Sequence, residues 1–585
     1  MDKDMDNVSD LIDCESPSTP GDKKRIPKSP TRRRFLGQVG VAALGAGALA
    51  TGRPASAHPR ESAEDDLLKP DGLVNKRLKA AHKLRLRLAN EDNQTGPAPN
   101  TTNGDLTLYP DKVGVYTKGL PHDQFGRVDS AAYETFQTAL ASGRASDFKK
   151  IVMGGTRTLN GPEAGLAFDL EAKDNAQFGQ PEVPPAPALA GDVTGTELLE
   201  HYWASLLRDV PFGGYDSNPL AAMAATEFSA MTSYLGPRNN AGQVTTDLLF
   251  RGGFPGESLG PYLSQFFVKP TTLGAQTINQ QLTTYLPGID YVTSFDDWVS
   301  VQNGNVIGKN QVDPQPRYAR NGRDMAAYTH VDVLYQAYFT AYLVLSSIGA
   351  PFNPGNPYIG SKTENGFGTF GGPDIASTLA DAACRALNTV WYQKWFVHLR
   401  PRPEALAGPV HLVMTGQGSN TDIQPSSVLL NSVGLQQSFN KYGTWLLSQA
   451  FPEASPTHPS YPTGHGSVGG ACLTVLKFFF DGSFVISNPV MPASDGLSLV
   501  PYTGSDAGQL TVNGELNKLG HNVSFGHGTH AGIHWRSDTD TSLLLGEACA
   551  ISFLNDKAKT YNEPFTVTFE KFDGTTATIT NTGNP

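Results

Sequence analysis

Cysteine is scarce in this sequence, and no two cysteines have the C-x-x-C spacing of a metal site. Of four cysteines in 585 residues, Cys14 lies near the N-terminus and the other three lie in apolar helical patterns. Three is an odd number, which does not suit a framework of disulfides. We therefore predict that Cys384, Cys472 and Cys549 are buried free thiols, and the spacing argues against a cysteine-based zinc site.

Basic residues are also in deficit. The chain has 45 Lys and Arg against 56 Asp and Glu, a formal net charge of −11. Because no basic face is evident, nucleic acid is excluded as a bulk partner. A pocket for an anion would have to be formed locally, against the overall field of the protein.

The first 57 residues have the order of features found in twin-arginine export signals. The stretch TRRRFLGQVGVAALGAGALATGRPASA joins Arg32 and Arg33 to an apolar run and ends on the A-x-A cleavage site Ala55-Ser56-Ala57. The apolar run is rich in Gly and Ala and too short for a membrane span. We expect export in the folded state to the periplasm or the exterior, with no membrane segment in the mature form. The alternative is a basic tail without targeting value.

Beyond this signal, composition divides the chain into three parts. Residues 58–190 are an expected N-terminal arm and loop-rich segment, and 58–110 in particular are polar and rich in Pro and Asn. Residues 191–556 have helical patterns and form the expected catalytic domain. In the tail, 557–585, the stretch FTVTFEKFDGTTATIT alternates apolar and polar residues around Asp573-Gly574, which predicts a β-hairpin.

Three stretches have the apolar spacing of long helices. They are residues 195–212, residues 323–349, which are apolar nearly all round and predict one buried helix, and residues 373–399, which end before Pro401 and Pro403. Residues 240–320 are rich in Gly, Asn and Gln and predict loops with short helices.

Basic residues surround two prolines at the end of the third helix. The stretch KWFVHLRPRPEA contains Lys394, Arg400 and Arg402. A lysine and an arginine about two turns apart can flank an oxyanion, the arginine through its planar fork. The alternative is a solvated basic helix end.

A second stretch, HPSYPTGHGSVGGACLTVLKFFF, predicts a helix whose first residues face an anion. Apolar residues follow helical spacing after His465, so Thr463, Gly464 and His465 lie at a helix N-terminus with free backbone N–H groups. Glycine lets the backbone come close, threonine adds a hydroxyl, and His465 is placed for acid–base chemistry. The alternative is a capped helix with a surface histidine.

The third stretch, GHGTHAGIHWRSD, contains three of the thirteen histidines of the chain. On one helix, His527, His530 and His534 would share a face and could look at one point. Asp538 lies one turn after His534 and can orient its imidazole. These histidines therefore either form a metal site together, or only one of them takes part in the chemistry.

In this order and with these spacings, the three stretches resemble the vanadium-dependent haloperoxidases and the related acid phosphatases. The strings KWFVHLRPRPEALAG, HPSYPTGHG, GIHWRSD, GLAFDLE, RNGRDMAAYTHVDVLYQAYF and NGFGTFGGPD look most like the red-algal bromoperoxidase branch. The resemblance runs from about Pro162 to the C-terminus. It implies an all-α fold of two helix bundles around a central oxyanion site, with long loops, and a large homo-oligomer.

The resemblance also implies a cofactor, substrates and roles for individual residues. The cofactor would be vanadate, and the substrates hydrogen peroxide, a halide and an organic acceptor. His534 would be the axial ligand to vanadium, and His465 the acid–base residue, oriented by Asp332. The residues that hold the vanadate oxygens would be Lys394, Arg402, Thr463 and Gly464. Lys394 would also polarise the bound peroxide.

His458 precedes His465 by seven residues, where similar bromoperoxidases carry histidine and fungal chloroperoxidases carry an aromatic residue. This favours bromide and iodide over chloride. The alternative is a loop histidine without any part in halide choice.

The chain departs from the family pattern at the second arginine. Counting back from His534 places that arginine at Gly528, and aligning from the left places it at His527. Loss of an arginine–oxyanion contact costs about 1.5–3 kcal/mol of binding. A protonated His527 would replace it in part and make vanadate affinity depend on pH. Arg536 would point to another face.

Three other functions stay open at this point. An acid phosphatase or phosphotransferase would use His534 as nucleophile and His465 as leaving-group acid. A catalytically weak, oxyanion-binding relative would follow from the missing arginine. A zinc site would join His527, His530 and His534, although no carboxylate completes the set.

Overall fold

The structure, a computed structural model, describes residues 71–170, 173–178 and 183–582. The predicted export signal and residues 58–70 of the predicted arm lie outside these ranges. Contacts divide the chain into two units, residues 1–84 and 85–585. The predicted domain boundaries after residues 57, 190 and 556 stay predictions.

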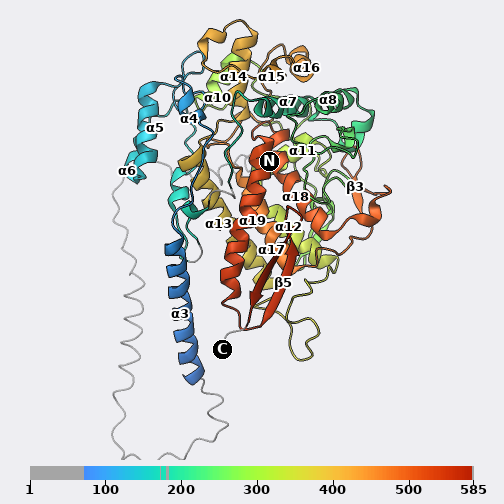
Figure 1. Cartoon of the computed structure of the whole chain (residues 1–585). Coiled ribbons are helices and arrows are strands. Elements are labelled where there is room, and N and C mark those ends of the chain that lie inside the picture. The colour runs from blue at the N-terminus through green and yellow to red at the C-terminus, as the bar shows by residue number, and fades with distance from the viewer. Residues whose placement is uncertain (1–70, 171–172, 179–182, 583–585) are drawn as a thin grey trace, which may run out of the picture. The chain divides into compact units, whose positions relative to one another are not determined.

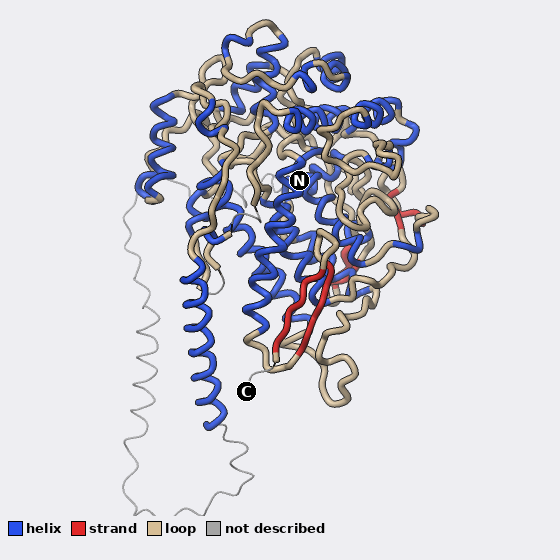
Figure 2. The backbone as a smooth tube through the Cα atoms, viewed as in Figure 1, coloured by secondary structure: helices blue, strands red, loops and turns tan. Residues whose placement is uncertain are grey.

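Helices make up most of the regular structure in the described ranges (Figures 1 and 2). The longer ones are α3 (Asp71–Thr95), α5 (Ser130–Ser142), α7 (Asp192–Leu207), α8 (Pro219–Ser229), α10 (Phe295–Gln302), α11 (Gly322–Val331), α12 (Gln336–Ser347), α13 (Gly372–Tyr392), α14 (Pro403–Met414), α16 (Val433–Tyr442), α17 (Gly464–Phe479), α18 (Val512–Phe525) and α19 (Arg536–Ala558). One-turn helices are α4 (Asp105–Leu108), α6 (Ala145–Phe148), α9 (Gln265–Val268) and α15 (Ser427–Leu430). Two π-helical turns are η6 (Gln393–His398) and η9 (Gly526–His530). The 3₁₀ turns are η2 (Pro162–Leu166), η3 (Asn175–Gln177), η4 (Phe212–Ser217), η5 (Thr246–Leu248), η7 (Gly418–Asn420) and η8 (Ala507–Gln509).

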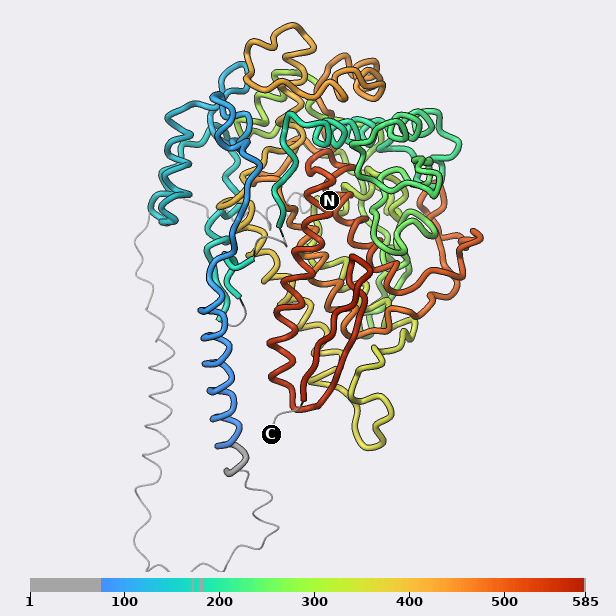
Figure 3. The backbone as a smooth tube through the Cα atoms, in the orientation of Figure 1, coloured from blue at the N-terminus to red at the C-terminus, as the bar shows by residue number. Residues whose placement is uncertain are grey.

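Strands within the described residues form only two-stranded antiparallel sheets. The pairs are β1 (Thr271–Leu273) with β2 (Gln276–Ile278), β3 (Val490–Pro492) with β4 (Leu499–Pro501), and β5 (Phe565–Glu570) with β6 (Thr576–Asn581). The last pair is the predicted C-terminal hairpin. It packs on α17 and α19, beside which it is seen in Figure 3. The predicted all-α class is confirmed.

The centre of the second unit is α17, which packs between α13 and α19 and is buried along its whole length. Glycines allow the backbones of α17 and α19 to approach closely. A Cβ on Gly470 would lie 2.0 Å from the Leu543 carbonyl oxygen, and one on Gly546 would lie 2.0 Å from that of Ser467. This contact fixes the start of α17 beside the start of α19.

A second group of helices surrounds α7, which packs against α8, α15 and α16. Helix α7 is buried through most of its length and also contacts η9, so it joins this group to the elements around α17. The two groups correspond to the two predicted bundles.

Two predicted helices are broken where the site is built. Residues 323–349 form α11 and α12, because Asp332 is extended (φ −70°, ψ 148°) and leaves the helical path. The stretch around His527, His530 and His534 is likewise not one helix. The turn η9 ends at His530, Gly532 takes a left-handed φ of +89°, and α19 begins only at Arg536.

Two further predictions need correction. Part of the loosely held arm, residues 71–95, is the helix α3, because its Lys, Arg, Leu and Ala are strong helix formers. Cys472 and Cys549 are buried as predicted, but Cys384 is exposed, since its position on α13 faces away from α17. Within the described ranges, no helix has the length and apolarity needed to cross a membrane.

A buried histidine on α18 links stability to pH. His521 lies between two carboxylates, with Nδ1 2.5 Å from Glu257 Oε1 and Nε2 2.8 Å from Asp540 Oδ1. Burial alone would lower the pKa of His521, but the two carboxylates outweigh it and raise the pKa to about 9. A raised pKa contributes stability below the unfolded value of about 6.5 and loses it as pH rises to the folded value.

We predict that the free energy of unfolding falls by about 3 kcal/mol between pH 6.5 and 9 through this group. Urea unfolding at several pH values measures the slope. His521→Gln should flatten it, whereas the control His82→Gln, at an exposed position on α3, should keep it. An equal slope in wild type and His521→Gln would show that this cluster does not couple folding to protons.

Candidate active site

Four separate segments bring the predicted site residues together. Lys394 lies in η6, Arg402 precedes α14, Thr463 to His465 start α17, and His534 lies in the turn before α19. Asp332 joins them from the break between α11 and α12. The three sequence stretches, far apart in the chain, therefore meet at one place.

His534 is held through one ring nitrogen and leaves the other one unused. Its Nδ1 lies 3.0 Å from Asp538 Oδ2, as the spacing predicted, while its Nε2 is buried and has no partner. Burial and the nearby Arg402 and Lys394 lower the pKa of His534 well below its usual value. The imidazole is therefore neutral, with its proton on Nδ1 and a lone pair on Nε2.

The Asp538 carboxylate is fixed by several donors. Oδ2 accepts from the hydroxyl of Ser460 and the backbone N–H of Trp535, and Oδ1 accepts from Arg400 Nη1 at 2.8 Å. Arg400 also bonds Glu197 and stacks over the Trp535 ring at 4.8 Å. These donors fix the position of the Asp538 carboxylate beside His534.

Lys394 and Arg402 are buried, and their hydrogen bonds among the described residues go to neutral groups. Lys394 Nζ donates to the carbonyls of Pro459 and Ser460 at 2.8 and 3.0 Å. Arg402 donates to the carbonyls of His458 and Ile533, both at 2.9 Å. Burial lowers the pKa of Lys394 strongly and that of Arg402 to about 10. Neutral carbonyls offset only part of this charge, so an anion is the missing complement.

The start of α17 presents donors to the same place. Thr463 is the N-cap residue, yet its hydroxyl does not cap the helix and is buried without a partner. A Cβ on Gly464 would lie 3.2 Å from Trp391, so a side chain here would crowd that ring. His465 Nε2 lies 3.0 Å from Asp332 Oδ1. The predicted pairing of His465 with Asp332 is thus present, at a helix break instead of on a helix.

The three histidines of the third stretch do not converge. His527 stacks on His465 at 4.0 Å between ring centroids and lies 5.6 Å from His534, with its Nδ1 buried and without a partner. His530 turns away, and its Nε2 lies 2.8 Å from the Tyr262 hydroxyl. The expectation that all three point to one position is wrong, because His530 bonds Tyr262 although it lies in the same π-helical turn as His527.

The two alternative positions of the missing arginine, 527 and 528, lie differently in the structure. Gly528 supplies only its carbonyl, which accepts the N–H groups of Gly532 and Ile533 in the turn. His527 carries a ring into the site. Arg536 points elsewhere, as predicted, and forms a buried pair with Glu200.

His458 lies at the edge of the same cluster. Its ring is 4.8 Å from that of Trp391 and 6.4 Å from that of His534, and its Nδ1 is 3.0 Å from Arg402 Nη2. The His458 side chain is therefore packed against residues of the site and is not exposed in a loop. Arg400, Ser460 and Trp391 are contacts that sequence reasoning left unassigned, although Arg400 stands in a repeated Arg-Pro pair that marks it.

Comparison with known proteins decides the family. A vanadium-dependent bromoperoxidase of Ascophyllum nodosum is 34% identical over 506 residues, which are 82% of this chain and 88% of that protein. The chain belongs to the vanadium-dependent bromoperoxidases. Two further bromoperoxidases, from Corallina pilulifera and Corallina officinalis, are each 32% identical over 601 residues, 87% of this chain and 100% of theirs. No family model matches the chain.

A solved bromoperoxidase has the same fold. The homohexameric second vanadate-dependent bromoperoxidase of Ascophyllum nodosum superposes on this chain with a TM-score of 0.82 and 28% sequence identity, over 92% of this chain and 95% of that one. The helices that position the site are therefore arranged as in that bromoperoxidase.

Proposed function

We propose that this chain binds vanadate between His534, Lys394 and Arg402 and oxidises bromide and iodide with hydrogen peroxide to a hypohalous species that halogenates organic acceptors. The observation that carries the proposal is a neutral His534 with a free, buried Nε2 beside two buried cations. The bromoperoxidase relatives support it, and neither a phosphatase nor a zinc site has comparable support.

The residues present fit a tetrahedral oxyanion. Three buried polar atoms without partners, His534 Nε2, Thr463 Oγ1 and His527 Nδ1, come from segments that meet here. Lys394, Arg402 and the backbone N–H groups of Gly464 and His465 add positive potential from other sides. When bound, vanadate supplies a Lewis acid that activates peroxide without a change in oxidation state.

The side chains around that site have separate roles in the proposed reaction. Asp332 accepts the Nε2 proton of His465 and so directs the Nδ1 lone pair of His465 to take a proton from hydrogen peroxide. Asp538 holds His534 in the tautomer that leaves Nε2 free. Lys394 directs its positive charge at the oxygens held beside it. His458, between Trp391 and Arg402, favours bromide and iodide over chloride.

Vanadate binding and bromination test the proposal together. The mature chain from His58, dialysed against EDTA, should brominate a dimedone-type substrate with peroxide only after orthovanadate is added. His534→Ala should lose both vanadate binding, measured by calorimetry, and activity. His530→Gln should keep both, because His530 lies outside the site. Absence of vanadate binding by the wild type would contradict the proposal. Phosphoester hydrolysis would then be assayed.

We also propose that His527 replaces the second arginine of the family. Its Nδ1 has no protein partner, and its ring is fixed by stacking on His465. His527→Ala should weaken vanadate binding about ten- to a hundredfold, the cost of one hydrogen bond to an ion. His527→Arg should restore or tighten binding, since an arginine is charged at every working pH. Unchanged dissociation constants in both variants would assign His527 a packing role only.

Export and assembly complete the proposal. The order of features in residues 31–57 supports export by the twin-arginine route to the periplasm or exterior. A homohexameric relative supports assembly of the mature chain into a homo-oligomer. Protein recovered from the exported fraction should begin at His58 and sediment as a single species several times the mass of one chain. A monomer at micromolar concentration contradicts the assembly.

A further inference from the structure

His330, in the last turn of α11, lies two residues before Asp332 and has none of the roles proposed above for the reaction. Its imidazole is bonded at both nitrogens, because Nδ1 lies 2.6 Å from the Tyr285 hydroxyl and Nε2 lies 2.5 Å from Glu453 Oε1. The ring also stacks on Phe451, with 3.9 Å between the ring centroids and 9° between the planes. Three contacts with other segments therefore fix this side chain.

Asp332 has few contacts of its own. Its Oδ1 lies 3.0 Å from His465 Nε2, while its Oδ2 is buried and has no partner among the described residues. Its two neighbours in the chain, Val331 and Val333, are 42% and 61% exposed, so little packing holds this part of the backbone. Going back along the chain from Asp332, the first side chain bonded to other segments is that of His330.

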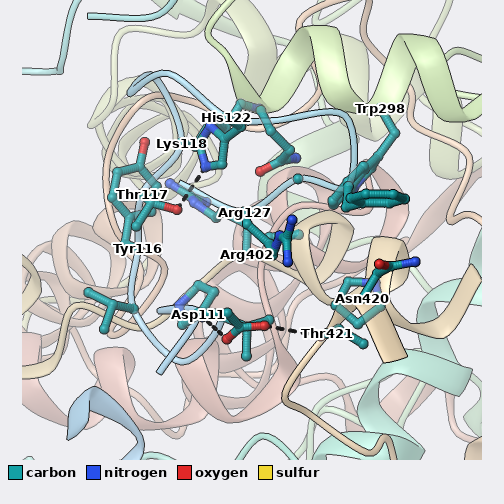
Figure 4. A pocket seen from close by; sticks show the side chains of 18 residues that line it. Asp111, Tyr116, Thr117, Lys118, His122, Arg127, Trp298, Arg402, Asn420 and Thr421 are labelled. Atoms are coloured by element: carbon teal, nitrogen blue, oxygen red, sulfur yellow. Dashed lines mark hydrogen bonds between the residues drawn. The ribbon is translucent and has the colours of Figure 1, made fainter. Parts of the chain in front are cut away.

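The acceptor of the His330 proton is itself held in place. The Glu453 carbonyl accepts from Lys118 Nζ at 2.9 Å. Lys118 and Arg402 line one pocket, seen from close by in Figure 4, so the turn at Glu453 is tied to the same region as an arginine of the site. Burial would raise the pKa of Glu453, but the adjacent His330 outweighs burial and lowers it, so Glu453 is an ionised acceptor.

Two contacts thus join the end of α11 to the segment that leads into α17. His330 bonds Glu453, and two residues later Asp332 bonds His465, which follows Glu453 by twelve residues. Because the first contact fixes the backbone next to Asp332, it limits the positions from which the carboxylate reaches His465. Without it, Asp332 would lie between two exposed valines with a single hydrogen bond to hold it.

We propose that His330 and Glu453 form a positioning pair that holds Asp332 against His465. The pair acts through Asp332 and not on the reacting atoms. The inference rests on the proposed function, in which His465 takes a proton from hydrogen peroxide. Proton transfer requires the imidazole in one orientation, and loss of a supporting contact of this kind costs about ten- to a hundredfold in activity.

Crystal structures of the mature chain without vanadate test the positioning directly. In the wild type, His465 Nε2 and Asp332 Oδ1 should lie within hydrogen-bonding distance, whereas in His330→Ala the Asp332 carboxylate should move away or take several positions. The control His411→Ala should keep the contact. His411 is a matched histidine, since it also lies in the last turn of a helix, stacks on a phenylalanine and bonds a hydroxyl group.

A His465–Asp332 contact that is unchanged in His330→Ala would overturn the inference. This result depends neither on vanadate binding nor on bromination, so it is separate from a failure of the proposed function.

Bromination kinetics distinguish positioning from a general structural role. His330→Ala and Glu453→Ala should each lower kcat/KM for hydrogen peroxide about tenfold, with the bromide KM and the vanadate dissociation constant unchanged. Glu453→Gln should keep near wild-type rates, because the amide oxygen still accepts the Nε2 proton of His330. Equal losses in Glu453→Gln and Glu453→Ala would contradict the proposed contact. His411→Ala should change none of these constants.

A double-mutant cycle shows whether the pair acts through Asp332. Asp332→Ala alone should lower kcat/KM for peroxide at least as much as His330→Ala, and the two changes together should cause no further loss. A further tenfold loss in the double variant would assign His330 another route of action and refute the positioning role. Glu453→Ala removes the same contact and replaces His330→Ala in the cycle if that variant does not fold.

Discussion

The buried ion pair between Arg400 and Asp538 is the interaction on which the site depends. Arg400 comes from the loop before α14 and Asp538 from the first turn of α19, so their contact ties two of the site-forming segments together. Removing Arg400 would leave the buried carboxylates of Asp538 and Glu197 without this cation, which costs far more than the pairing contributes. The same carboxylate sets the tautomer of His534, so the stability of this region and the reactivity of its histidine have one origin.

Close helix packing makes that arrangement rigid. Gly470 and Gly546 let α17 and α19 approach to a distance that no larger residue would permit. The first turn of α17, with Thr463 and His465, is thereby held against the first turn of α19. The backbone N–H of Thr463 donates to the Asp538 carbonyl at 3.3 Å, which also holds the two helix starts together.

Local patterns predicted the contacts that are short in sequence, whereas the pairing of His465 with Asp332, 133 residues apart, was predicted from the family resemblance alone. The pairing of His534 with Asp538 follows from a separation of four residues, and the helix after His465 follows from apolar spacing. The helix break at Asp332 has no local signal, since its surroundings are apolar and helix-compatible. It exists because the carboxylate meets a histidine 133 residues away. The outward turn of His530 toward Tyr262 and the role of Arg400 depend in the same way on tertiary contacts.

Lys394 and Arg402 couple the folding equilibrium to anion binding, although the chain as a whole is acidic. The chain is acidic, yet its interior holds two cations whose nearest partners are neutral carbonyls. Any anion that binds between them stabilises the native state and has no comparable site in the unfolded chain. Oxyanion concentration in the surroundings therefore acts on the folding equilibrium as well as on turnover, and the resistance of this protein to heat or denaturant is a property of the protein together with its medium.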